Sequence, residues 1–325
     1  MKSFSFLALA MTISVSFLSS VHAADTRLTV VTGNTIVQDM AVQIGGTRVD
    51  ATCLLQPGVD PHSYQPVPAD VKRLAAAQLV IINGLGFEGW FEGLAKEAGI
   101  KGTVIVATKG IPTLKMEAED DHAGHGHDHG HDHSSDHSSD HSSDNSKAHG
   151  QVDDPHAYNS IANGVRYAEN IRDAFIAADV AGAEIYRASA AAYITQLRAA
   201  DASAKMQFAS LTKAQRKLIS NHDALQYFAH EYGFEILAPN TALEDSQPSA
   251  KDLAELIDFI KNQKVKGVFL EFGKNDKIIA QIAKEAGVTI GAELYLDGVG
   301  AAGSPAGTYL GMFQTNVSSI VAGLK

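Results

Sequence analysis

The chain has almost no cysteine: Cys53 is the only one in 325 residues, so no intrachain disulfide can form. A chain of this length can bury enough apolar surface to fold without one. Cys53 lies in an apolar, strand-like run, and we expect a small core residue there rather than a metal ligand. It also lies far from the start of the chain, so we expect no lipid anchor on an N-terminal cysteine.

Long apolar runs are equally scarce. The one candidate, residues 4–17, follows Lys2 and precedes Val21-His22-Ala23. It is too short to span a membrane, and it ends in a pattern typical of signal-peptide cleavage sites. We therefore predict that residues 1–23 are a secretory signal peptide cut after Ala23. The mature protein is then expected to be a soluble monomer in the periplasm.

Basic residues are too few for a nucleic-acid-binding protein. The chain has 26 Lys and Arg against 37 Asp and Glu, a formal net charge of −11, and no basic stripe. Residues 117–154 hold eleven of the acidic residues and only one lysine. The negative charge is therefore concentrated in one segment, which would attract cations over a long range.

That acidic segment also contains nine of the fourteen histidines, set among Asp, Gly and Ser. It cannot bury enough apolar surface to offset the entropy of ordering it, so we predict a disordered loop over 117–153. Imidazoles and carboxylates suit a borderline-soft ion such as Zn²⁺, and the loop is interpreted as an auxiliary, low-affinity zinc collector. The alternative is a solvated spacer whose metal binding is incidental. The candidate auxiliary ligands are His122, His125, His127, His129, His131, His133, His137, His141 and His149.

Short β-branched runs alternate with helical patterns along the rest of the chain, which is typical of parallel sheets flanked by helices. The strands expected first are 27–32, 48–52, 79–82 and 103–106, with helices over 34–42, 69–76, 90–98 and 157–177. The same alternation occurs again later in the chain, with strands expected over 217–220, 235–237, 267–270 and 288–290, and helices over 224–232, 250–263 and 277–286. The pattern predicts an α/β protein of two lobes.

Between the two sets lies one long helical pattern, 181–211, with no Gly after Gly182 and no Pro. Its apolar residues recur at spacings of three and four, so one stripe faces a core. A single helix of this length would extend roughly 45 Å and act as a stiff bridge. Two shorter helices with a break near Asp201 are the alternative. The predicted organisation is a first lobe over 24–180, a linking helix over 181–211 and a second lobe over 212–325.

Candidate ligands lie where predicted strands end. Two identical tripeptides, Asp60-Pro61-His62 and Asp154-Pro155-His156, precede helical sequence, and proline limits how each histidine enters its loop. His222 follows a predicted strand of the second lobe, at the edge where open α/β sheets bind ligands, and Asp297 follows the last strand. Three imidazoles and one carboxylate would complete a tetrahedral zinc site with no open catalytic position.

These residues carry a resemblance to the zinc-binding, ZnuA-type substrate-binding proteins of bacterial ATP-binding-cassette importers, over nearly all of the mature chain. The stretches that resemble the family are Gly58-Val59-Asp60-Pro61-His62-Ser63-Tyr64, Asp154-Pro155-His156, Asn221-His222-Asp223-Ala224-Leu225-Gln226-Tyr227-Phe228, Gln247-Pro248-Ser249-Ala250-Lys251-Asp252-Leu253 and Gly307-Thr308-Tyr309-Leu310. The resemblance implies two lobes bridged by one long helix, with zinc held in the cleft by His62, His156, His222 and Asp297. It also implies delivery to a permease in the inner membrane.

Several alternatives stay open. Manganese-binding relatives tend to have glutamate at the position of His222, so zinc is favoured mainly by that imidazole, and copper and nickel also bind imidazole. A periplasmic zinc hydrolase would need an open coordination position, and no HExxH motif or nucleophile elbow occurs. A free-standing zinc buffer or metallochaperone is the third class. Asp60, Asp154 and Glu271 are candidates for supporting the ligands, and Tyr158 stands where the family more usually has tryptophan.

Overall fold

The computed structural model describes residues 27–117, 151–219, 223–236, 250–274 and 276–325. The predicted signal peptide, the histidine-rich segment 118–150 and His222 lie outside the described residues. Within those ranges the protein is α/β, as predicted. No helix of the described part is both long and apolar enough to cross a membrane.

The first part of the chain is built on a parallel sheet of four strands in the order β2-β1-β3-β4. All four predicted strands form, with shifts of one residue at their ends. Their bounds are β1 (Leu28–Thr32), β2 (Val49–Cys53), β3 (Leu79–Ile82) and β4 (Thr103–Val106). Because the four strands are parallel, the loops that follow them lie at the same edge of the sheet. The strand order reverses between β1 and β3, the position at which open α/β sheets bind ligands.

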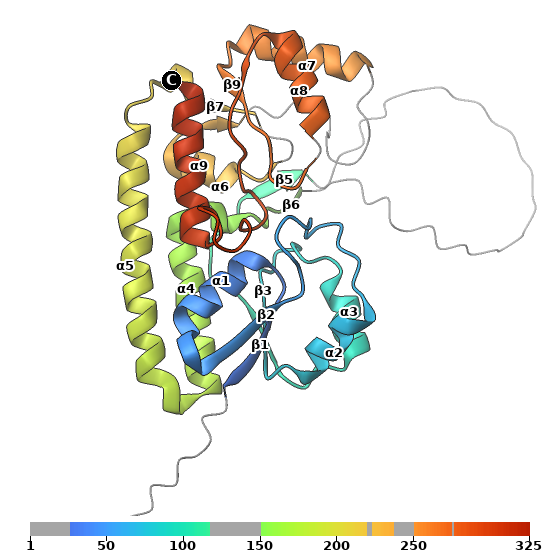
Figure 1. Cartoon of the computed structure of the whole chain (residues 1–325), viewed down its shortest axis with the longest axis vertical. Helices are drawn as coiled ribbons and strands as arrows, with labels where there is room; N and C mark the ends of the chain where they lie inside the picture. Colours follow the sequence, from blue (N-terminus) through green and yellow to red (C-terminus); the bar gives the residue numbers. More distant parts are fainter. Residues whose placement is uncertain (1–26, 118–150, 220–222, 237–249, 275) are drawn as a thin grey trace, which may run out of the picture.

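Helices cover both faces of this sheet (Figure 1). Because side chains alternate along a strand, Val30 and Ile81 pack with α1 (Thr35–Gly45), while Val31 and Val80 pack with α2 (Pro68–Ala76) and α3 (Phe91–Ala98). The Asn34 side chain caps α1 by accepting a hydrogen bond from the Val37 N–H at 2.9 Å.

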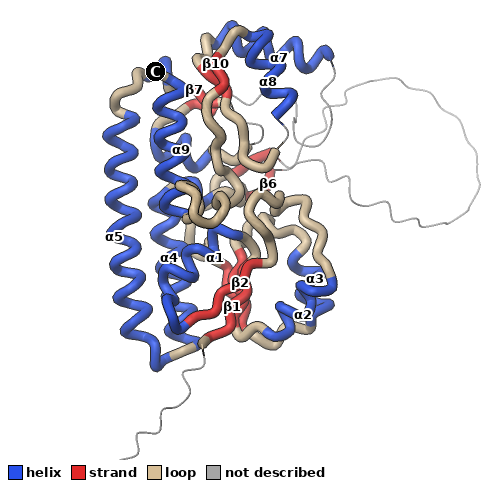
Figure 2. The backbone as a smooth tube through the Cα atoms, in the orientation of Figure 1, coloured by secondary structure: helices blue, strands red, loops and turns tan. Residues whose placement is uncertain are grey.

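The long helix is continuous, and the alternative of a break near Asp201 is wrong. Helix α5 (Ala183–Phe208) runs antiparallel to α4 (Ile161–Ala178) along one side of the molecule (Figure 2). Every residue of the expected apolar stripe is buried: Tyr186, Ala190, Tyr193, Leu197, Ala200, Ala204, Phe208 and Leu211. Its first turn is fastened through Asp179 Oδ2, which accepts from Tyr186 Oη at 2.7 Å and pairs with Arg48 at 2.8 Å.

The later part of the chain has shorter strands than expected. Strands β7 (Lys217–Leu218) and β8 (Glu235–Ile236) pair in parallel, as do β9 (Gly267–Val268) and β10 (Thr289–Ile290). Each strand was predicted one or two residues longer, and residues 220 and 237 of those predictions lie outside the described residues. The helices between them are α6 (Gln226–Tyr232), α7 (Ala250–Gln263) and α8 (Asp276–Ala286). The predicted alternation is confirmed, although these ladders are only two residues long.

The last helix, α9 (Tyr309–Leu324), was not predicted from the sequence. Thr308 caps it by accepting from the Gly311 N–H at 3.0 Å, and Asp39 of α1 accepts from the Tyr309 N–H at 2.8 Å. Helix α9 packs against α5 and α1, and one buried apolar cluster contains residues of α1, α4, α5 and α9. The last helix therefore shares one core with the first helix of the described residues.

The ends of the predicted disordered loop are ordered. Strands β5 (Lys115–Glu117) and β6 (Gln151–Asp153) form an antiparallel pair with Met116 opposite Val152. The expectation of a loop over the whole of 117–153 is therefore wrong for Glu117 and for 151–153. Hydrogen bonds between the two strands pair their backbone N–H and C=O groups, and the composition of this segment does not predict that pairing.

The end of α5 should be a large contributor to stability. The Phe208 ring lies 4.9 to 5.5 Å from the rings of Phe228, Tyr232 and Phe234 and is 1% exposed. Phe208→Ala should lower the free energy of unfolding by about 3–5 kcal/mol, because it leaves a cavity among these rings. Met206→Ala, on the same helix at 71% exposure, should change it by less than about 0.5 kcal/mol. Urea unfolding followed by circular dichroism measures both, and equal effects would contradict the packing role of Phe208.

Candidate metal centre

The two Asp-Pro-His tripeptides adopt the same local turn. In the first, Asp60 Oδ1 accepts a hydrogen bond from the His62 N–H at 2.9 Å; in the second, Asp154 Oδ1 accepts from the His156 N–H at 2.9 Å. Such an Asx turn, with proline between the two residues, leaves the histidine backbone few conformations. Both aspartates therefore cap the loops that carry the two histidines.

Asp154 also holds the imidazole of His156. The same Oδ1 atom lies 2.8 Å from His156 Nδ1, and both side chains are at most 2% exposed. A carboxylate accepts hydrogen bonds, so Nδ1 carries the proton of the neutral ring and the lone pair of Nε2 faces away from Asp154. This arrangement is the one that metal-binding histidines commonly have.

The imidazole rings of His62 and His156 approach each other through their Nε2 atoms. The two Nε2 atoms are 3.2 Å apart, and His62 is the more open of the two, with its side chain 29% exposed. Its loop is tied to α3 by the Trp90 Nε1–H, which donates to the Pro61 carbonyl at 2.8 Å. The Phe87 ring makes a T-shaped contact with both rings, at centroid distances of 4.9 Å for His62 and 5.8 Å for His156.

Phe87 is set in place by the buried carboxyl of its neighbour Glu88. Glu88 Oε1 accepts from the Asn83 N–H and from Asn34 Nδ2, both at 2.9 Å, and Oε2 accepts from the Gly84 N–H at 3.2 Å. Burial raises the pKa of Glu88, while these three donors oppose the rise. The loop after β3 is thereby fixed beneath the histidines.

Asp297 reaches the histidines from the other part of the chain. Its Oδ1 lies 3.5 Å from His156 Nε2, and its Oδ2 lies 3.8 Å from His62 Nε2. The Tyr158 hydroxyl donates to Oδ1 at 3.2 Å, so Tyr158 orients this carboxylate. The Asp297 side chain is 9% exposed, which leaves little room for water around it.

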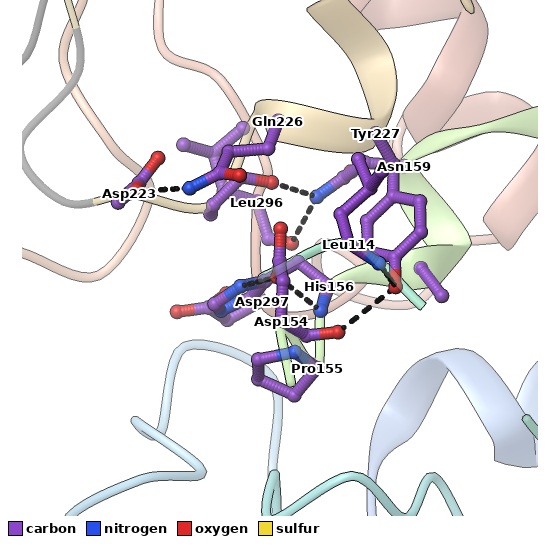
Figure 3. Close-up of polar contacts among 12 residues, drawn as sticks. Leu114, Asp154, Pro155, His156, Asn159, Asp223, Gln226, Tyr227, Leu296 and Asp297 are labelled. Carbon is purple, nitrogen blue, oxygen red and sulfur yellow. Dashed lines mark hydrogen bonds and ion pairs between the residues drawn. The ribbon is translucent and has the colours of Figure 1, made fainter. Parts of the chain in front are cut away.

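Residues of the first part of the chain hold the backbone on both sides of Asp297. Asn159 Nδ2 donates to the Leu296 carbonyl at 3.4 Å, and the Val299 N–H donates to Thr35 Oγ1 at 3.0 Å. Asn159 Nδ2 also donates to the carbonyl of Ala224 at 2.9 Å, and Ala224 lies two positions after His222 in sequence. Figure 3 shows Asn159 beside Leu296. Asn159 therefore joins a segment that follows the third predicted ligand, His222, to the residue that directly precedes the fourth, Asp297.

Three of the four predicted ligands are brought together. One ligand atom from each of His62, His156 and Asp297 lies within 4.8 Å of the others. A tetrahedral zinc ion bound at about 2.0–2.1 Å would hold two nitrogens about 3.3 Å apart, close to the 3.2 Å observed between the imidazoles. His222 and the nine auxiliary histidines lie outside the described residues.

The remaining supporting candidates have different surroundings. Glu271 is 2% exposed, and its backbone forms an isolated parallel β-bridge with Leu294. It lines the same cavity as Asp60 and Asp297 but does not belong to the three-residue cluster. Asp60 faces Lys274, whose Nζ lies 2.7 Å from Oδ2. Burial raises the pKa of Asp60, but Lys274 and the His62 N–H outweigh it, and the net pKa is lowered. Sequence patterns gave no signal for Lys274, Asn159 or Phe87, because their roles depend on contacts distant in sequence.

The bonding partners of His156 predict one tautomer in the metal-free protein. Two-dimensional ¹⁵N–¹H NMR that links ring nitrogens to ring protons should show His156 protonated at Nδ1 and bare at Nε2. In Asp154→Ala this preference should be lost, because the acceptor is gone. His230, exposed on α6, is the internal reference and should be unchanged. A His156 ring protonated at Nε2 in the unaltered protein would contradict the geometry.

Comparisons with known proteins agree with this fold. The solved structure of the periplasmic zinc binding protein TroA from Treponema pallidum superposes with a TM-score of 0.76 at 26% identity, covering 92% of this chain and 99% of TroA. The manganese-binding lipoprotein MntA of Bacillus subtilis (strain 168) is 31% identical over 312 residues, 94% of this chain and 93% of MntA. The iron-binding protein YfeA of Yersinia pestis is 30% identical over 324 residues, 98% of this chain and 94% of YfeA.

The names of these relatives bear on two expectations. MntA is named a lipoprotein, as are streptococcal relatives named as substrate-binding proteins of metal ABC transporters, which disagrees with the expected absence of a lipid anchor. Their printed metals include manganese, iron and zinc, so zinc specificity is not given by these matches. The family model described as "Zinc-uptake complex component A periplasmic" matches residues 30–323. The chain belongs to this family of metal-binding proteins.

Proposed function

We propose that this chain captures a divalent metal ion outside the cytoplasm and delivers it to the permease of an ABC importer, and that its cargo is zinc. The observation that carries the proposal is the convergence of His62 Nε2, His156 Nε2 and the Asp297 carboxylate from distant parts of the chain. His222 is the proposed fourth ligand. The family is one of metal-binding transport proteins rather than enzymes.

Zinc is favoured by the chemistry of the proposed ligands. Imidazole suits zinc, while manganese prefers sites richer in carboxylate and water. With His222 the set is three imidazoles and one carboxylate, all four positions of a tetrahedral ion. The second candidate is a manganese- or iron-binding protein, and the names of MntA and YfeA favour it.

Capture is proposed to use ligands already in place. The Asx turns, the Asp154–His156 pair and the Tyr158–Asp297 bond orient three donors, so little conformational entropy is lost when an ion binds. Because α5 is a continuous helix packed against both ends of the chain, we expect release to proceed by rearrangement of the ligand loops more than by a large rotation of the lobes.

Calorimetric titration of the mature protein with zinc, manganese and copper tests the choice of metal. Zinc should bind with one tight site, more tightly than manganese. His222→Ala should weaken zinc binding by at least about 100-fold, since even changes around the ligands cost 10- to 100-fold. His230→Ala, which removes an exposed imidazole, is the control and should leave the affinity unchanged. Tighter binding of manganese, or no effect of His222→Ala, would favour the second candidate.

The histidine-rich segment is proposed as an auxiliary collector of zinc. Deletion of residues 121–149 removes nine imidazoles and should leave the tight site intact while lowering the total number of zinc ions bound. Replacing the nine histidines with serine at constant length is the matched control for loop length and should have the same effect. Unchanged stoichiometry in both variants would reject the collector role.

A free-standing zinc buffer is distinguished from an importer component by growth. Cells starved of zinc should depend on this protein only when the matching permease is present. A benefit that persists without the permease would favour the buffer.

A further inference from the structure

Two loops from opposite parts of the chain meet beside the candidate metal centre. Residues 56–62 carry His62, and residues 271–274 follow β9. Together they line one cavity that Asp297 also borders. Their backbones approach closely: a Cβ on Gly273, which has a φ of +89°, would lie 2.8 Å from the Gly58 carbonyl oxygen. This contact needs glycine at position 273.

An ion pair closes the same contact. Lys274 Nζ lies 2.7 Å from Asp60 Oδ2, and the two side chains are 27% and 29% exposed. Asp60 Oδ1 meanwhile accepts from the His62 N–H at 2.9 Å. The Asp60 carboxylate thus makes two contacts. One oxygen accepts from the backbone of the proposed ligand His62, and the other pairs with Lys274 from the later part of the chain.

Lys274 lies among carboxylates rather than in open solvent. Burial lowers its pKa, but Asp60, Glu271 and Asp297 raise it, and the net pKa is above the usual value. Among the described residues that line the cavity, Lys274 is the only Lys or Arg. The pair is therefore partly screened from water and should be stronger than an ordinary surface ion pair.

We propose that Lys274 is a positioning residue, and that its pair with Asp60 is a latch that sets how long the bound metal stays. The inference rests on the proposed metal-binding function. Metal release requires the His62 loop to move away from Asp297, and the latch holds that loop against residues 271–274. Breaking the pair lowers the barrier to this movement, so its effect falls mainly on the dissociation rate.

The competing role of Lys274 has the opposite sign. If its charge acted only by repelling an incoming cation near Asp297, its removal would strengthen metal binding and slow release. A latch predicts faster release. The direction of the change in dissociation rate therefore separates the two roles.

The test is stopped-flow release of zinc from the loaded full-length mature protein into excess chelator. Lys274→Met, which keeps the length of the side chain, should release metal about tenfold faster, as expected for loss of a partly buried charge pair. Asp60→Asn keeps an oxygen for the His62 N–H and should have a similar effect. The double variant should be no faster than either single one, because both remove the same interaction. Lys274→Arg should restore most of the slow release.

The control is Lys205→Met, which removes a lysine paired with Glu231 at 2.6 Å and Asp201 at 2.9 Å, between α5 and α6. It should leave release unchanged. Unchanged or slower release in Lys274→Met, additive effects in the double variant, or an equal effect of Lys205→Met would overturn the latch. Circular dichroism of each metal-free variant checks the fold, and Asp60→Asn tests the pair independently if Lys274→Met does not fold. If the unaltered protein binds zinc tightly and Lys274→Met does not change the release rate, the latch alone is rejected. If the unaltered protein binds no metal, the proposed function is rejected.

Discussion

The candidate centre depends most on the hydrogen bonds between the Asp154 carboxylate and His156. This carboxylate accepts from the backbone of His156 and from Nδ1 of the same residue, so one oxygen fixes the turn, the ring orientation and the tautomer. The other oxygen is buried and has no hydrogen-bond partner among the described residues. The Tyr227 hydroxyl, from α6, in turn donates to the Asp154 carbonyl at 3.2 Å (Figure 3). A buried network of this kind holds one geometry, because each broken bond leaves a polar group without compensation.

The two parts of the chain interlock around this centre. Asp297 belongs to the later part, yet Tyr158, Asn159 and Thr35 hold it and its neighbours in place. Lys274 contributes from the later part to the loop of His62. Helices α5 and α9 pass through the same apolar core as α1 and α4. The site and the core are therefore stabilised by the same arrangement of helices, and opening the site must break polar contacts while most of the core stays packed.

Much of the fold was predictable because its signals are local. The four strands of the first sheet are β-branched runs, and the stripe of α5 repeats at helical spacing. The strand ends were therefore predicted to within one residue and the helix ends to within three. Helix α9 was missed, although Thr308 precedes a long apolar run and is a recognisable cap. The short strands of the later part and the β5–β6 pair could not be placed well. Ladders of two or three residues depend on partners distant in sequence more than on their own composition.

The sequence by itself determined the types of the candidate ligands and the loops that carry them, since Asp-Pro-His restricts its own backbone and imidazole suits a borderline-soft ion. Only the tertiary structure decided that His62, His156 and Asp297 converge. It also decided that Tyr158 donates to the Asp297 carboxylate and Asn159 to the Leu296 carbonyl. The ion pair between Lys274 and Asp60 likewise has no local signal. The physical reason is range. Turns and periodic stripes arise between residues a few positions apart, whereas these contacts join residues between 94 and 235 positions apart in sequence.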